Sequence, residues 1–376
     1  GATIVLGFTV MAGLLSMTAI HMPHLPPLML VWEGTLGFVV VTVTAVTSAT
    51  IYGLQQRMLA AKRLGQYQLE RKLGQGGMGQ VFLARHAMLQ RRTAVKLLTG
   101  STSALAQTRF RREVQTASGL THPNTIEIYD YGRTPEGIFY FAMEYVEGAT
   151  LDAVVRATGP MPARRVVHLL RQAAGSLGEA HARGLIHRDV KPQNVMLCQR
   201  GGQHDTVKVL DFGLVRDLAA EVDVADDQLT GTPLYLAPEA ILEADGFVVE
   251  SDVYALGAVG YFLLTGHPPF VGSLLDILSD HLATEPEPLP AIDVAELGEL
   301  VMRCLAKDPS ARPPSALALV GDLERIEASA RWTKQEAELW WAEHRDIVDR
   351  GSADPDAISM GSLDHLSIAG RRSASA

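Results

Sequence analysis

Cysteine is nearly absent from this chain, which has only Cys198 and Cys304 among its 376 residues. Two cysteines cannot build the disulfide framework of a small secreted domain, and their spacing is not that of a zinc site. They fit a protein that works in a reducing compartment. Basic residues are also in deficit, since 33 Lys and Arg stand against 42 Asp and Glu and give a net charge of −9. With no basic arm in the sequence, this balance argues against nucleic acid as a partner.

Charged residues are almost missing from the first 54 positions. The segments Thr3–Ile20 and Leu36–Leu54 contain none, and each is close to the roughly 20 residues that cross a bilayer. A proline-rich turn, His21–Pro27, separates them. We therefore predict two transmembrane helices in residues 1–56, with a buried helix of a soluble protein as the alternative for either segment.

A short basic linker, 57–66, follows the second hydrophobic segment. It contains Arg57, Lys62 and Arg63, and basic residues beside a membrane span favour the cytoplasmic side. We expect the chain to be anchored in the cell (inner or plasma) membrane, with the lipid bilayer as a partner. The remainder of the chain would then face the cytoplasm.

The most informative motif is His187-Arg-Asp-Val-Lys-Pro-Gln-Asn194. An aspartate, a lysine and an asparagine at these spacings are typical of phosphoryl transfer, where Asp189 would accept a hydroxyl proton and Asn194 would hold a metal ion. A His-Arg-Asp tripeptide by itself is more often a surface or capping group. The order of the other motifs therefore decides the interpretation.

A glycine-rich run, Leu73-Gly-Gln-Gly-Gly-Met-Gly-Gln-Val81, lies upstream. Gly74, Gly76 and Gly79 would let the backbone approach phosphate oxygens and turn tightly. A dinucleotide fingerprint would instead require a following helix and an acidic residue about 20 positions on, where this chain has Lys96. The Walker phosphate loop fails too, because Gln80 follows Gly79.

Three further motifs follow in order. The segment from Ala104 to Gly119 is predicted to be a helix that carries Glu113, the natural partner of Lys96. Asp211-Phe-Gly213 follows an apolar strand, and Ala237-Pro-Glu239 lies downstream of it. Asp189 and Asp211 are thus two carboxylates of one predicted site, and Asp211 would bind the magnesium that bridges the nucleotide phosphates.

This ordered set, over roughly Tyr67 to Arg325, closely resembles the eukaryotic-like (Hanks-type) protein kinase family, in particular its bacterial Ser/Thr members. The resemblance implies an α+β, bilobal fold with a β-rich N-lobe of five antiparallel strands and a helical C-lobe, and ATP with Mg²⁺ or Mn²⁺ between the lobes. It assigns catalytic roles to Asp189, Lys191, Lys96 and Glu113, and metal binding to Asn194 and Asp211. The residues it implies for ATP binding are Leu73, Gly74, Gly76, Gly79, Val81, Ala94, Lys96, Glu144 and Val146.

The same resemblance implies specificity for Ser and Thr, because Lys-Pro-Gln lies between Val190 and Asn194. Thr232 and Glu239 would belong to the substrate-docking region, with Arg312 as the partner of Glu239. Asp252 would brace the catalytic loop. In Ala142–Val146, the strand that recognises adenine, Met143 would occupy the gatekeeper position.

The expected activation loop has few hydroxyl groups. Thr230 is the only one between Gly213 and Gly231, and it is a candidate phosphosite. Arg188 indicates a loop that negative charge must neutralise, so Asp226 and Asp227 could partly replace a phosphothreonine. The alternative is a solvated acidic loop without this role.

The end of the chain divides into a helix and a tail. Trp332–Trp341 has the pattern of a capped helix, in which Thr333 and Glu336 form a capping box. Its tryptophans are expected to pack on the C-lobe or on a partner. Ser373, in the predicted disordered tail, is a second candidate phosphosite. The predicted divisions are 1–56, 57–66, a kinase domain over 67–327, a helix over 328–350 and a tail over 351–376.

The expected function is transfer of the γ-phosphate of ATP to Ser and Thr hydroxyls of proteins, in membrane-linked signalling with autophosphorylation and, through it, self-association. A membrane-tethered pseudokinase that binds ATP as a scaffold is the main alternative. A membrane sensor or transporter with the kinase as its output, and a small-molecule kinase, are the others.

Overall fold

Two units make up the chain in the computed structural model, Gly1–Gln68 and Leu69–Ala376. The structure describes residues 63–76, 79–98, 112–134, 138–212, 233–243 and 246–347. In this part of the chain no helix is long and apolar enough to cross a membrane. Both predicted spans lie outside it. In the first unit, strand β1 (Arg63–Leu64) turns through Gly65 and pairs antiparallel with the start of β2.

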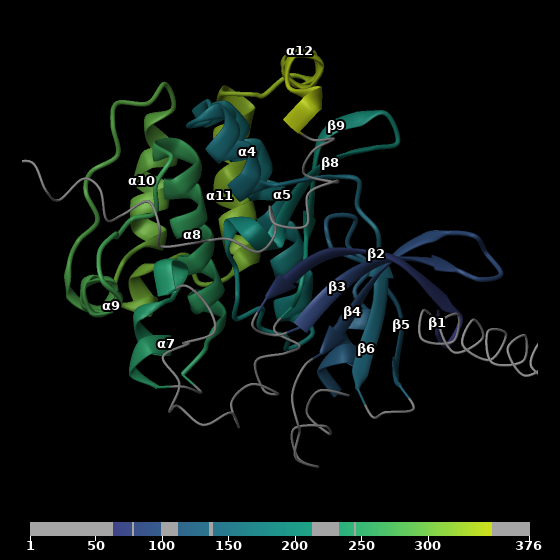
Figure 1. Ribbon diagram of the computed structural model, residues 1–376. Helices are drawn as coiled ribbons and strands as arrows, with labels where there is room; N and C mark the ends of the chain where they lie inside the picture. The colour runs from purple at the N-terminus through teal and green to yellow at the C-terminus, as the bar shows by residue number, and fades with distance from the viewer. Residues whose placement is uncertain are drawn as a thin grey trace, which may run out of the picture. The chain divides into compact units, whose positions relative to one another are not determined.

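The second unit begins with a β-rich lobe. Its strands are β2 (Tyr67–Gly76), which enters from the first unit, β3 (Gly79–His86), β4 (Arg92–Leu98), β5 (Ile128–Arg133) and β6 (Phe139–Glu144). They form one sheet in the order β2-β3-β4-β6-β5 (Figure 1). The pairs β3–β4, β4–β6 and β5–β6 are antiparallel, as predicted.

A helical lobe follows. Its helices are α4 (Leu151–Thr158), α5 (Ala163–Ala182), α7 (Pro238–Leu242), α8 (Val249–Thr265), α9 (Leu274–Ala283), α10 (Ala295–Cys304), α11 (Ala316–Ser329) and α12 (Lys334–Glu343). Nearly every residue of α8 is buried, because its sequence is apolar on all sides and a helix of that kind is stable only inside a core. Around it lie α5, α10 and α11 (Figure 1). The predicted bilobal fold is therefore confirmed.

A small sheet carries the catalytic segments. Its strands are β7 (Gly148–Thr150), β8 (Val195–Arg200) and β9 (Gln203–Val209), in that order and antiparallel. The one-turn helix η1 (Pro192–Asn194) leads into β8, and β9 leads into Asp211. Because Val195 pairs with Val209, this register places Asn194 and Asp211 at the same end of the sheet.

His281 on α9 gives a testable pH dependence of stability. Its side chain is fully buried, and its Nδ1 lies 2.7 Å from the Tyr254 hydroxyl. Burial, together with the nearby Lys307 charge, lowers the pKa of His281 to about 4 from 6.5. As the pH falls from 6.5 to 4, the unfolded chain takes up the proton first. The contribution of His281 to the free energy of unfolding is therefore complete above about pH 6.5. It falls by up to about 3 kcal/mol as the pH is lowered toward 4.

His281→Gln should reduce the fall in melting temperature between pH 7.5 and pH 4.5. The control is His267→Gln, since His267 is exposed and keeps the acid dependence of the unchanged chain. Equal acid dependence in both variants would contradict this account of His281.

Candidate active site

The predicted catalytic loop, His187–Asn194, is held in place by hydrogen bonds to Asp252 of α8. One carboxylate oxygen, Oδ2, accepts hydrogen bonds from the His187 backbone N–H at 2.7 Å and lies 2.8 Å from His181 Nε2. The other, Oδ1, accepts the Arg188 backbone N–H at 2.9 Å. Asp252 is 1% exposed, so these bonds form away from water. This bracing role was expected of Asp252, whereas the participation of His181 was not predicted.

His187 links the loop to the strand that ends at Asp211. Its Nε2 lies 2.8 Å from the Leu210 carbonyl oxygen, while its Nδ1 accepts the Asp189 backbone N–H at 3.3 Å. The ring also packs against Phe212, with the centroids 4.7 Å apart. The loop and the strand end are therefore tied together by one fully buried side chain.

The Asp189 side chain is contacted by two other polar residues of its motif, Lys191 and Asn194. Lys191 Nζ is 2.9 Å from Oδ1 and 2.8 Å from Oδ2, so it bridges both carboxylate oxygens. The Asn194 side-chain N–H donates to Asp189 Oδ2 and to the Asp189 carbonyl oxygen, each at 2.8 Å. The bonds made by Asn194 set the direction of the Asp189 carboxylate and leave the amide oxygen of Asn194 for another ligand.

Asp211 has two differently placed oxygens. Its Oδ2 accepts a hydrogen bond from Lys96 Nζ at 2.7 Å. Its Oδ1 is buried, and no hydrogen-bond donor within the described ranges reaches it. An unsatisfied buried carboxylate oxygen is costly unless a ligand or ion completes it.

The donor chemistry of this site fits magnesium. Asp211 Oδ1 and the Asn194 amide oxygen are hard oxygen ligands, and Mg²⁺ is usually held by one or two carboxylates with waters and substrate phosphates. No cluster of three or more His, Cys, Asp or Glu that could form a complete protein cage occurs among the described residues. The residues present therefore fit a metal that is bound together with a nucleotide.

Two of the four non-glycine residues with a positive φ in the described part of the chain lie at this site. Arg188 and Asp211 have φ values of 63° and 52°, in the left-handed region that non-glycine residues rarely adopt. Such strain persists only where surrounding bonds over-determine the conformation, and it is typical of functional sites. Here those bonds are the Asp252 contact to Arg188 and the Lys96 contact to Asp211.

The expected ion pair between Lys96 and Glu113 is not formed. Lys96 pairs with Asp211 instead, and Glu113 Oε1 lies 3.1 Å from Arg188 Nη1. Glu113 belongs to residues 112–118, which are helical as predicted. Each charged group pairs with the opposite charge that the fold brings within about 3 Å, which is Asp211 for Lys96 and Arg188 for Glu113.

The described residues of the glycine-rich run belong to two neighbouring strands of the sheet, with β2 ending at Gly76 and β3 starting at Gly79. Gly79 has a φ of 144°, and a Cβ there would lie 2.0 Å from the Leu97 carbonyl oxygen. Only glycine fits this position. The predicted nucleotide contacts Leu73, Val81 and Ala94 lie on β2, β3 and β4, and Val81 pairs directly with Lys96.

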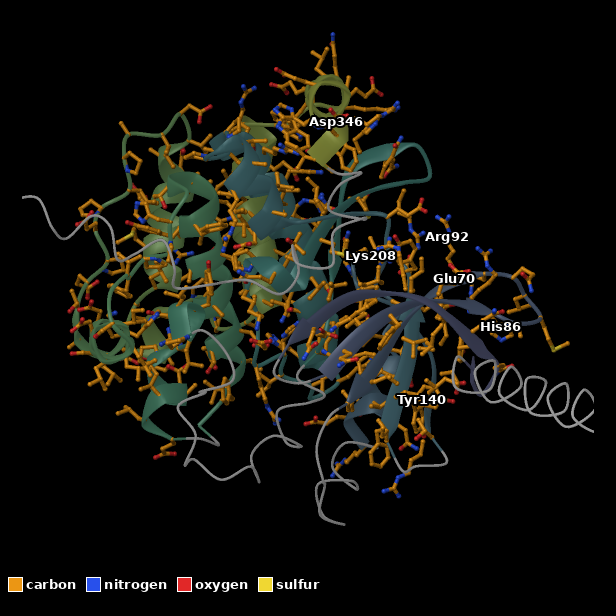
Figure 2. All side chains as sticks on the ribbon, viewed as in Figure 1. Glu70, His86, Arg92, Tyr140, Lys208 and Asp346 are labelled. Atoms are coloured by element: carbon orange, nitrogen blue, oxygen red, sulfur yellow. The ribbon has the colours of Figure 1, made fainter. Side chains whose placement is uncertain are left out.

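The hinge strand ends at Glu144, whose buried side chain pairs with two basic residues. It is 3% exposed, its Oε2 lies 3.0 Å from Lys208 Nζ, and Arg200 is a second partner. Lys208, labelled in Figure 2, also donates to the Thr125 carbonyl oxygen at 3.1 Å. Only the backbone of Glu144 remains for a nucleotide. Burial lowers the pKa of Lys208, and the sequence offered no sign of this contact beyond a lysine inside an apolar strand.

Glu239 and Arg312 form the expected pair in a bidentate geometry. The distances are 2.8 Å for Nη1–Oε1 and 2.9 Å for Nη2–Oε2, and Ser251 Oγ donates to Oε1 at 2.5 Å. Burial alone would raise the pKa of Glu239, but the bonds from Arg312 and Ser251 outweigh it and lower the pKa. The pair anchors α7, which carries Glu239 of the predicted docking region.

Several predicted residues lie outside the described ranges. They are Thr230, Thr232, Asp226, Asp227 and Ser373. The predictions made for them remain predictions. The predicted capping box of the C-terminal helix is confirmed, since Thr333 accepts the Glu336 backbone N–H and Glu336 accepts that of Thr333.

A β-rich lobe with a buried lysine, joined to a helical lobe with this aspartate, lysine and asparagine loop, is the architecture of a protein kinase. The chain belongs to the protein kinase domain family, whose model matches residues 67–322.

Curated relatives and a solved structure agree with this assignment. The chain is 37% identical over 283 residues to serine/threonine-protein kinase pkn3 of Myxococcus xanthus, which covers 70% of this chain and 50% of that protein. It is 39% identical over 271 residues to PknB of Mycobacterium tuberculosis, covering 69% and 42%. The crystal structure of the PknI kinase domain of Mycobacterium tuberculosis matches with a TM-score of 0.53 and 29% identity, over 70% of this chain and 97% of that one. The chain thus spans about half the length, or less, of these curated relatives.

Proposed function

We propose that this chain is a serine/threonine protein kinase that uses ATP and Mg²⁺ to phosphorylate Ser and Thr hydroxyls of proteins. The observation that carries the proposal is the convergence at Asp211, where Lys96 contacts one oxygen and the other is buried without a donor from the described residues. A cation and a free carboxylate oxygen at one residue suit a metal-bound nucleotide phosphate.

Asp211 and Asn194 would hold the metal, and Mn²⁺ prefers the same oxygen donors as Mg²⁺. When bound, the metal neutralises charge on the nucleotide phosphates. Lys96 lies 2.7 Å from Asp211, and its ammonium would contact the α- and β-phosphates of the bound nucleotide. The backbone of the hinge, at Glu144 and Val146, would recognise adenine.

Asp189 would accept a hydrogen bond from the substrate hydroxyl and orient it toward the γ-phosphate. Its direction comes from Asn194, which donates to both its side chain and its carbonyl oxygen. Lys191 lies against the same carboxylate and would stabilise the negative charge on the transferred group. Thr232 and Glu239 would contribute to docking of the protein substrate.

Incubation of the full chain with labelled ATP and Mg²⁺ tests the proposal, beside a Lys96→Met variant. We expect phosphate on Ser or Thr of the chain itself or of a generic protein substrate, and none with Lys96→Met. Mapping of the modified residues would also test Thr230 and Ser373 as sites of autophosphorylation between associated copies. Equal labelling in the variant, or labelling of a small metabolite only, would contradict the proposal.

The membrane location is the second part of the proposal. It is supported by the uncharged segments Thr3–Ile20 and Leu36–Leu54 and by the basic linker after them. In cell fractionation, the full chain should stay with membranes after an alkaline carbonate wash, with the kinase domain accessible to protease from the cytoplasmic side. Release by carbonate, or protection of the kinase domain from that side, would contradict the location.

A further inference from the structure

Asp205, at the start of β9, is a buried carboxylate with all its acceptor positions filled. Its Oδ2 accepts hydrogen bonds from Arg165 Nε at 2.9 Å and Trp332 Nε1 at 2.8 Å. Its Oδ1 accepts from Arg165 Nη2 and Trp341 Nε1, each at 2.7 Å. Asp205 and Arg165 are each 1% exposed. Four donors saturate a carboxylate, so no water or further ligand is needed to stabilise this charge.

The two indole donors, Trp332 and Trp341, lie after α11 in the sequence. We use "C-terminal strap" for residues 331–343, which include α12 and begin after the family match ends at 322. The Arg165 guanidinium lies over the Trp340 ring, with its Cζ 3.7 Å from the ring centroid. Arg164 pairs with Glu336 at 3.0 Å. Figure 1 shows α12 beside the β8–β9 hairpin, on which the strap lies.

Elsewhere little of the strap is buried, since Ala337 and Trp341 are its two buried residues. A pocket of about 720 Å³ lies beside it, and its lining includes His168 and Arg171 of α5 together with Lys334 of the strap. Continuous apolar packing therefore does not hold the strap along its length. The attachment is concentrated at Asp205 and Arg165, where charge-assisted hydrogen bonds are stronger than neutral ones.

Asp205 is also strained. Its φ is 53°, which an L-residue adopts at a cost, and such a conformation persists when its surroundings over-determine it. The four bonds to its carboxylate supply that determination. These bonds hold the start of strand β9 in one conformation.

From Asp205 a continuous series of hydrogen bonds follows β9. The Asp205 carbonyl oxygen accepts Gln172 Nε2 at 2.8 Å, and Gln172 Oε1 accepts the Val207 N–H at 3.1 Å. The Asn124 side chain donates to the Val207 carbonyl oxygen at 2.7 Å, and the Asn124 carbonyl oxygen accepts the Val209 N–H at 2.7 Å. The strand is therefore held on α5 and on the segment around Asn124 along its length.

The same strand ends at the metal ligands. The Leu210 N–H donates to the Asn194 carbonyl oxygen at 2.8 Å, and its own carbonyl oxygen contacts His187. Asp211 follows immediately. A displacement of the start of β9 would therefore be transmitted to both Asn194 and Asp211.

We propose that Asp205 and the C-terminal strap are positioning residues of the phosphotransfer site, which hold β9 so that Asp211 and Asn194 meet the metal with the correct separation. This inference rests on the proposed function for the identity of the metal–nucleotide ligand. It extends the functional catalytic unit past the family match, to the end of α12.

The test uses the full chain with Trp32→Phe as background. The chain has four tryptophans, so the remaining three all report on the strap. Asp205→Gly removes the carboxylate and accepts the left-handed backbone without strain. The matched control is Gln90→Gly, at a residue with a φ of 54° in an exposed turn of the other lobe. Asp205→Asn, which tolerates the same φ and keeps one acceptor oxygen, should rescue part of the effect.

Two quantities are measured: quenching of tryptophan fluorescence by acrylamide, and the Kd for Mg²⁺ with the non-hydrolysable analogue adenylyl imidodiphosphate. In Asp205→Gly we expect increased quenching and a Kd raised about fivefold or more, the lower range of coupling between distant sites. The control should change neither. Trp341→Phe, which keeps the ring and loses one donor, should act in the same direction and serves if Asp205→Gly does not fold.

Increased quenching with an unchanged Kd would overturn the positioning role and leave the strap as a stabilising element. Unchanged quenching would overturn the attachment itself. If the background chain does not bind the Mg²⁺–analogue complex, the proposed function fails. Acrylamide quenching would still test, independently, whether the strap is attached at Asp205.

Discussion

Replacement of Asp189 by Asn should lower kcat by about 10²- to 10⁴-fold and leave the KM for ATP nearly unchanged. Asn has the same shape, but it cannot take the proton of the substrate hydroxyl. Its amide would also present an N–H where Asp189 now accepts bonds from Lys191 and Asn194. The measurement is steady-state kinetics with a protein substrate.

The control is Asp293→Asn, the same chemical change at a carboxylate whose side chain is 58% exposed. It should leave kcat unchanged. A kcat that falls equally in both variants, or an Asp189→Asn chain with normal kcat, would exclude Asp189 as the group that activates the hydroxyl.

The second large effect concerns stability. Arg312→Met should destabilise the chain by about 3–5 kcal/mol, because it leaves the half-buried Glu239 carboxylate without its bidentate partner. Arg312 also donates to the carbonyl oxygens of Ala306, Glu250 and Lys307, and these acceptors would lose their donor. The melting temperature should fall by on the order of 10 °C.

A surface pair supplies the comparison for Arg312. Arg325 pairs with Asp322, but its side chain is 77% exposed, so Arg325→Met should cost little. The double variant Arg312→Met with Glu239→Gln should be less destabilised than Arg312→Met alone, because no charge is then left unpaired. If Arg312→Met were no worse than Arg325→Met, the buried pair would not be an anchor of this lobe.

Local patterns predicted much of the fold. The capped helix after Thr333 and the strand before Asp211 both appear as expected. Each depends on side-chain periodicity or on a capping bond between neighbours, which are properties of a short segment. The site motifs also converge as expected, with Asp189, Asn194 and Asp211 at one end of the small sheet.

Partners across long sequence separations were harder to predict. Lys96 was expected beside Glu113, but its partner is Asp211, 115 positions away. Glu144 was predicted to contact the nucleotide through its backbone, and nothing in that prediction indicated that its carboxylate pairs with Lys208. The sequence shows that these groups are charged and need a partner when buried. It does not show which of several oppositely charged groups the packing brings within 3 Å.

By itself the sequence determined the family, the order of the motifs and the residue types of the site, because phosphoryl transfer requires those types at short fixed spacings. Tertiary structure alone decided the pairing of Glu113 with Arg188, the buried Lys208 beneath the hinge, and the attachment of three tryptophans around Asp205 and Arg165. A hydrogen bond or ion pair acts over about 3 Å. Which groups come that close depends on the packing of elements that the chain joins only through long intervening segments.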